Sequence, residues 1–145
     1  MAERLAPPAR GADVVAVPAT ARARRRRYHA ADLLAAAVAR RTALPYAPER
    51  LVKTRETGVQ STLPARDRAE NVRGAFRAQE GNRRVLLVDD VATSAATARE
   101  CARVLAAAGA AAITVWCFAR APKDGGDVAR STFDDFSPKA EPRDA

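Results

Sequence analysis

Two adjacent carboxylates and three hydroxyl side chains are the residues best suited to chemistry. Asp89 and Asp90 follow four consecutive apolar residues, and Thr93, Ser94 and Thr97 come shortly after them. Hydroxyl residues that open a helix bring unpaired backbone N–H groups and the positive end of the helix dipole together, which suits a phosphate. The carboxylates suit sugar hydroxyls or a hydrated Mg²⁺ ion. Together these groups predict a site for a phosphorylated ribose.

The elements that flank this group predict a parallel sheet. The apolar run 85–88 is typical of a strand buried on both faces, and the apolar spacing from about Ala95 to Ala108 predicts a helix that ends at Gly109. Residues 113–118 predict a second buried strand, so the three elements form a βαβ unit. In such a sheet the ligand lies outside the carboxyl ends of the strands, where the acid pair falls.

The remaining elements complete one α/β domain over residues 13–120. Residues 1–12 predict an irregular lead-in, and residues 121–145, rich in Pro, Gly and charge, predict a largely disordered tail with Phe133 and Phe136 as candidates for docking on the body. The other predicted elements are a strand over Asp13–Val17, a helix from about Tyr28 to Arg41, a strand within 50–57, a helix over about Pro64–Val72 and a short strand over Gly74–Ala78.

Composition restricts the class of protein and its partners. The 145 residues carry a formal net charge of +8, and the four basic and six acidic residues after Arg120 leave +10 on the preceding residues. Such a charge favours phosphates, pyrophosphate or nucleic acid as partners. Cys101 and Cys117 fit neither a zinc site nor a disulfide framework and are predicted to be buried thiols. With no apolar run of about 18 residues and no hydrophobic leader, we expect a cytoplasmic protein that does not associate with membranes.

The central stretch resembles the phosphoribosyl-pyrophosphate (PRPP) motif of type I phosphoribosyltransferases, an apolar strand, two acidic residues and a hydroxyl-rich phosphate loop. The matching positions are Asp89, Asp90, Thr93, Ser94 and Thr97, whereas Ala95 stands where the family has glycine. The resemblance implies a three-layer α/β fold with a mostly parallel sheet. A positive φ at Ala95 would cost on the order of 1 kcal/mol, which bears directly on phosphate affinity.

A second resemblance narrows the family to the ComF-type phosphoribosyltransferases associated with competence. Residues 15–18 and 26–35 are similar to that family's first strand and following helix, although Arg27, His29 and Ala30 replace its polar signature. Further along, the chain matches the family pattern at Arg55, Thr57, Gln60, Leu63, Arg68, Asn71 and Gly74-Ala75-Phe76. The zinc module that commonly precedes this domain is absent from the sequence, which leaves open a fragment, a misplaced start or a reduced relative.

The resemblance implies transfer of phosphoribose from PRPP to a nitrogen nucleophile, with release of pyrophosphate. Mg²⁺ is the implied cofactor, held through water by Asp89 and Asp90, and Lys53 and Arg55 are the other candidate catalytic residues. Arg22 and Arg24 are predicted to face the pyrophosphate. A lone His29 at a helix start is expected to be a cap or surface residue. The predicted 5′-phosphate site consists of Thr93, Ser94, Ala95, Ala96 and Thr97.

Other interpretations remain open at this point. An acidic pair after a strand also occurs in response-regulator receivers, which need more chain than the 55 residues after Asp90. The pair could also simply end a strand of another α/β domain. A third hypothesis is a PRPP-fold module with little or no catalysis, acting in DNA uptake or regulation, whose Arg24–Arg27 run contacts nucleic acid. The acceptor base and the choice between monomer and homodimer stay open.

Overall fold

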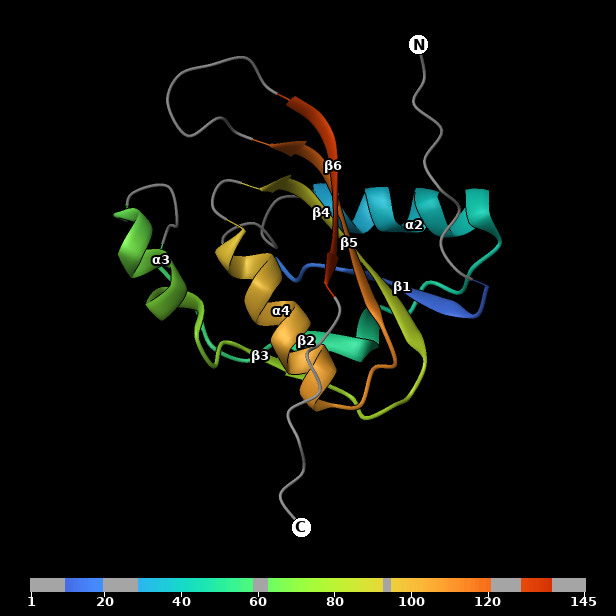
Figure 1. The fold of residues 1–145 in the computed structure, drawn as a ribbon, viewed down its shortest axis with the longest axis horizontal. Helices are drawn as coiled ribbons and strands as arrows, with labels where there is room; N and C mark the ends of the chain where they lie inside the picture. Colours follow the sequence, from blue (N-terminus) through green and yellow to red (C-terminus); the bar gives the residue numbers. More distant parts are fainter. Residues whose placement is uncertain (1–9, 20–28, 59–62, 93–94, 121–128, 137–145) are drawn as a thin grey trace.

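The computed structural model describes residues 10–19, 29–58, 63–92, 95–120 and 129–136, and its main feature is a four-stranded sheet (Figure 1). The strand order is β1-β4-β5-β6, formed by β1 (Ala12–Ala16), β4 (Arg84–Ala92), β5 (Ile113–Arg120) and β6 (Ala129–Phe136). β4 pairs in parallel with β1 and β5, whereas β6 runs antiparallel along the outer edge of β5. The sheet is therefore mostly parallel, as predicted.

Two helices cover opposite faces of this sheet and give it three layers (Figure 1). α2 (Ala30–Thr42) packs buried alanines against Val14, Leu86 and Val88. α4 (Ala96–Ala107) packs Cys101, Ala102 and Leu105 against the other face, where Val15, Leu87 and Ile113 lie. Because alternate residues of a strand point to opposite faces, the continuous apolar run of β4 supplies both cores.

A second, two-stranded sheet lies beside α4. β2 (Leu51–Lys53) follows the short 3₁₀ helix η1 (Pro48–Arg50) and pairs antiparallel with β3 (Phe76–Ala78). Between these strands the chain forms α3 (Ala65–Val72), which packs against α4. β2 and α3 thereby stand next to the helix that follows the acid pair.

A buried ion network holds the amino ends of the main strands. Asp13 is 5% exposed, and its two carboxylate oxygens lie 2.8 Å from Nη1 of Arg50 and 2.8 Å from Nε of Arg83. The Arg50 guanidinium also packs against Gly81, where an added Cβ would lie 3.2 Å from Nη1. The network ties β1, η1 and the start of β4 together at the end of the sheet away from the acid pair.

Two sequence predictions need correction. The tail is not irregular throughout, because residues 129–136 form β6, with Phe133 opposite Trp116 and Phe136 opposite Ile113. This strand forms because the edge of β5 offers unpaired backbone groups, which the composition of the tail could not predict. In addition, β4 extends through Asp89 and Asp90 to Ala92, beyond the apolar run 85–88 that predicted it. Residues 121–128 and 137–145 lie outside the described residues, as do 1–9 of the lead-in.

Among the helices of the described residues, none has the length and apolar character needed to span a membrane.

Candidate functional site

The acid pair lies near the carboxyl end of β4, between the ends of β1 and β5. Asp89 pairs with Cys117 in register and lies on the α4 face, within electrostatic range of Cys101. Both side chains are half-buried, and the Asp90 backbone amide donates to Oδ1 of Asp89 at 2.9 Å. The pair thus lies at the sheet edge where ligands of parallel sheets bind.

The electrostatics of the pair favour a cation. Burial, together with a side-chain hydrogen bond and charge repulsion from the neighbouring Asp90, raises the pKa of Asp89 to about 7. Two carboxyl groups this close resist simultaneous ionisation, because each disfavours the charged form of the other. A cation at the edge would relieve that repulsion.

The residues present fit a hydrated Mg²⁺ ion better than a dehydrated metal. No group of three or more His, Cys, Asp or Glu side chains that could enclose a metal occurs in the described part of the chain. Mg²⁺ usually keeps several waters and uses one or two carboxylates together with substrate phosphates. Asp89 and Asp90 supply such a set.

The turn between β4 and α4 has the conformation that glycine favours. Ala95 has φ 56° and ψ 5°, in the left-handed region, and its carbonyl accepts the Arg99 amide at 2.9 Å as α4 begins. The N-cap residue Ala95 makes no side-chain capping bond, and the first amides of an α-helix have no partner within the helix itself. Thr97, half-buried, lies in that first turn with Ala96. The helix start is thus suited to an anion, with the strain that the sequence anticipates at Ala95.

Several predicted site residues lie outside the described residues, so their roles stay predictions. These are Thr93 and Ser94 of the phosphate loop, Arg22 and Arg24 of the pyrophosphate loop, and Gln60 of the family pattern.

Lys53 ends β2 on the α4 side of the acid pair. Its Nζ donates to Oγ1 of Thr57 at 2.8 Å and lies 5.7 Å from the centroid of the Phe76 ring. Burial raises the pKa of the Cys101 thiol, the Asp89 carboxylate raises it further, and Lys53 opposes both effects. Lys53 and Asp89 therefore both lie within electrostatic range of the same buried thiol on α4.

Arg55 is held by backbone carbonyls. Its Nη2 donates to the carbonyls of Asn71 at 3.1 Å and Arg73 at 2.7 Å, and Nη1 to that of Glu56 at 3.3 Å. Beside it, the Asn71 side chain bonds to both the amide and the carbonyl of Gly58, at 2.9 and 3.0 Å. These contacts fasten the segment after β2 to the end of α3. Arg55 therefore stabilises the conformation of this segment. Its predicted catalytic role stays a prediction.

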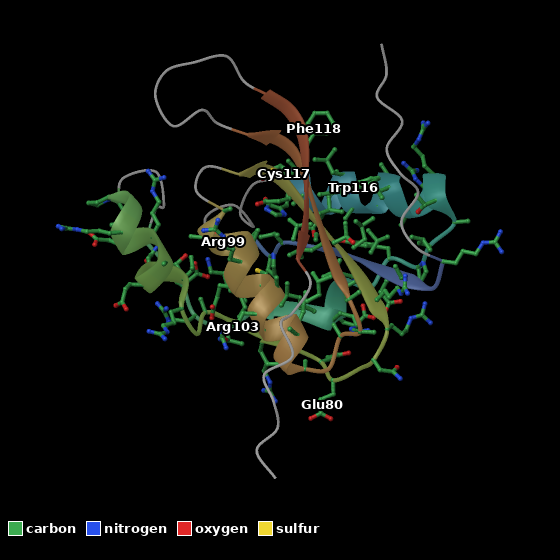
Figure 2. The ribbon with its side chains drawn as sticks, viewed as in Figure 1. Glu80, Arg99, Arg103, Trp116, Cys117 and Phe118 are labelled. Carbon is green, nitrogen blue, oxygen red and sulfur yellow. The ribbon has the colours of Figure 1, made fainter. Side chains whose placement is uncertain are left out.

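Four residues outside the motif also lie near the predicted site or were singled out in the sequence. His29 occupies the N-cap position of α2, as predicted, but its half-buried side chain makes no capping hydrogen bond; its Nδ1 lies 3.3 Å from Oδ2 of Asp32. Cys101 is buried and Cys117 half-buried, and neither is in a disulfide bond. Phe118 follows Cys117 on β5, level with Asp90, and is 70% exposed (Figure 2). Sequence reasoning missed Phe118, because an apolar strand residue is expected to be buried.

The chain matches curated proteins over most of its own length. It is 37% identical over 110 residues to the DNA utilization protein YhgH of Escherichia coli K12, which is 74% of this chain and 48% of that protein. It is 36% identical over 102 residues to competence protein F of Haemophilus influenzae, 67% of this chain and 44% of that protein. The chain thus spans about half the length of these relatives. No protein-family model matches it.

The chain is also similar to solved structures. The allosteric regulatory enzyme of purine biosynthesis is 26% identical, with a TM-score of 0.50 over 75% of this chain and 22% of that one. The glutamine PRPP amidotransferase of B. subtilis, in complex with ADP and GMP, is 25% identical over the same shares, with a TM-score of 0.48. The sheet order, the acid pair on β4 and the homology together show that the chain belongs to the ComF-type family, with the fold of type I phosphoribosyltransferases.

Proposed function

We propose that the carboxyl edge of β4 binds PRPP with Mg²⁺ and transfers its phosphoribose to a nitrogen nucleophile, releasing pyrophosphate. The observation that carries the proposal is the combination of Asp89 and Asp90 near the end of β4 with the amino end of α4, whose N-cap residue Ala95 supplies no capping side chain. In this arrangement the carboxylates receive the ribose hydroxyls, and the amides of Ala96 and Thr97 receive the 5′-phosphate.

The reaction depends more on stabilising the negative charge of the leaving pyrophosphate than on proton transfer. The bond from C1 of the ribose to the pyrophosphate oxygen breaks as the nitrogen bonds to C1, and the leaving pyrophosphate keeps the electron pair. Bound Mg²⁺ would neutralise the diphosphate charge. Lys53, held by Thr57, contributes a fixed cation on the α4 side, and the Phe118 ring offers a flat apolar face to a planar acceptor.

Calorimetry of PRPP binding tests the proposal. We expect saturable binding that requires Mg²⁺ and is lost in the Asp89→Asn/Asp90→Asn double variant, with Asp67→Asn, an exposed carboxylate on α3, as the control. Equal binding by the wild type and the double variant contradicts the proposal.

A second candidate is a module of the same fold with little or no turnover, acting in DNA uptake or regulation. The left-handed Ala95 favours it, because its Cβ and its strain both weaken a close approach to phosphate. The names of the relatives, a DNA utilization protein and a competence protein, point the same way. Mg²⁺-dependent PRPP binding without pyrophosphate release, tested with amines and nucleobases as acceptors, would favour the module.

A further inference from the structure

A group of arginines surrounds the amino ends of β1 and β4, at the end of the sheet away from the acid pair. Arg10 precedes β1, Arg83 and Arg84 open β4, and Arg40 and Arg41 form the last turn of α2. Three separate segments thus bring basic side chains to one end of the fold. We call these five residues the amino-edge arginines.

Pairing and packing show that the segments lie together. Ala12 is the register partner of Arg84, and Nε of Arg83 contacts the Asp13 carboxylate of β1 at 2.8 Å. Ala39, directly before Arg40, packs in the same cluster as Val14 and Leu86, which stand two residues inside the strands. The five residues therefore lie around the same end of the sheet.

These arginines are exposed and mostly without acidic partners. Of the five, only Arg83 has a carboxylate within ion-pair distance among the described residues, and its side chain is still 51% exposed. Glu80 precedes Gly81, which packs against Arg50 of the buried network, but Glu80 makes no ion pair with these five arginines among the described residues. An unpaired positive surface of this kind attracts polyanions.

Some arginines on or beside α3 and α4 provide a contrast. Arg66, Arg73 and Arg103 each have a carboxylate within range, at 3.4, 3.8 and 2.8 Å. These carboxylates partly offset their positive charge. Arg77 and Arg99 resemble the amino-edge arginines in being exposed, but they do not belong to a group of five at one end of the sheet.

We propose that the amino-edge arginines bind the phosphate backbone of nucleic acid, independently of the ribose-phosphate site. Arginine side chains pair well with phosphate oxygens, and several on one surface suit a chain of evenly spaced phosphates. No exposed aromatic side chain occurs at this edge among the described residues, so the contacts do not include base stacking and carry no sequence preference. The site does not depend on phosphoribosyl transfer.

The separation of the two sites makes the proposal distinct from binding through Arg24–Arg27. Arg84 and Asp90 are six residues apart along one strand, which corresponds to about 20 Å. A small ligand at the carboxyl edge should therefore leave nucleic-acid binding unchanged. Contacts from the 24–27 segment, which the sequence predicts to face the pyrophosphate, would instead compete with PRPP.

Fluorescence anisotropy with duplex and single-stranded oligonucleotides of two unrelated sequences, over a range of salt concentrations, tests the proposal on the full chain. We compare Arg40→Gln/Arg41→Gln with Arg77→Gln/Arg99→Gln, a matched pair of exposed arginines elsewhere on the surface. Glutamine has nearly the helix propensity of arginine, and thermal unfolding checks that both variants fold.

The amino-edge variant should reduce the slope of log affinity against log salt by about two, and at about 0.1 M salt should lose affinity roughly 50-fold. The control should change little, and saturating PRPP with Mg²⁺ should not displace the oligonucleotide. Equal losses in both variants, displacement by PRPP, or no binding by the wild type overturns the proposal. The comparison of the two variants, and the binding by the wild type, do not depend on whether PRPP binds.

Discussion

Replacing Ala95 by glycine should stabilise the protein, although it removes a methyl group and buries nothing new. Ala95 has φ 56°, and an L-residue in the left-handed region costs about 1–2 kcal/mol that glycine does not. The greater flexibility of glycine in the unfolded chain returns roughly 0.5–1 kcal/mol of this. The net gain in the free energy of unfolding is therefore about 0.5–1 kcal/mol, or roughly 2–5 °C in Tm.

The chain provides a matched control in Ala43, which has φ 55° at the end of α2. Ala43→Gly should give a similar gain, measured by thermal and urea unfolding, because both positions carry the same backbone strain. Only Ala95→Gly should also tighten the binding of ribose 5-phosphate, since only Ala95 adjoins the amides of α4. If Ala43→Gly stabilises the protein and Ala95→Gly does not, the left-handed turn before α4 is absent in solution and the reasoning about phosphate affinity is refuted.

Three further predictions concern titration and packing. Because burial raises the folded-state pKa of Asp89 to about 7 from 3.8, the folded state holds this proton over a wider pH range than the unfolded chain. The contribution of Asp89 to stability should therefore be largest below about pH 4 and decrease as pH rises to about 7 in the absence of Mg²⁺. Asp89→Asn should remove that decrease and raise the free energy of unfolding by roughly 2–4 kcal/mol at pH 8, measured by urea unfolding. A wild-type stability that rises over this interval while the variant's does not would contradict the pKa. Asp13→Asn should lower the free energy of unfolding by about 3–5 kcal/mol, since it leaves the 7%-exposed Arg50 without its carboxylate. Asp67→Asn, at an exposed pair, should lower it by under about 1 kcal/mol. Similar losses in the two variants would contradict the buried network. Gly81→Ala should cost roughly 1–2 kcal/mol because its Cβ would lie 3.2 Å from the Arg50 guanidinium, and combining it with Arg50→Ala should remove that extra cost in a double-mutant cycle.

The sequence predicted the elements that depend on local pattern. The four apolar residues 85–88 predicted the central strand, and the helical spacing after Ala95 predicted α4 to within a residue at each end. The position of the acid pair at the carboxyl edge followed from these two elements, because parallel strands share that edge. The substitution of alanine for the family's glycine predicted where strain would lie, and the structure places φ 56° there.

Features that depend on distant pairing could not be predicted. The Asp13–Arg50 contact joins residues 37 apart, and the bonds from Arg55 to Asn71 and Arg73 join residues 16 and 18 apart. Nothing in the local sequence shows that Arg55 donates to backbone carbonyls, because an arginine that binds a phosphate would look the same in the sequence. β6 forms on an edge that only the folded sheet provides, and Phe118 stays exposed because α2 covers β1 and β4 rather than β5.

Amide chemical shifts test the central claim most directly, because they report where a ligand binds. Titrating ¹⁵N-labelled protein with ribose 5-phosphate in Mg²⁺ should give saturable shifts concentrated in residues 89–97, at the end of β4 and the start of α4. Arg40, Arg41 and Arg84 should not shift, which separates this site from the amino edge. Shifts confined to the amino edge, or no saturable shifts at 89–97, would contradict the assignment of this edge as a sugar-phosphate site.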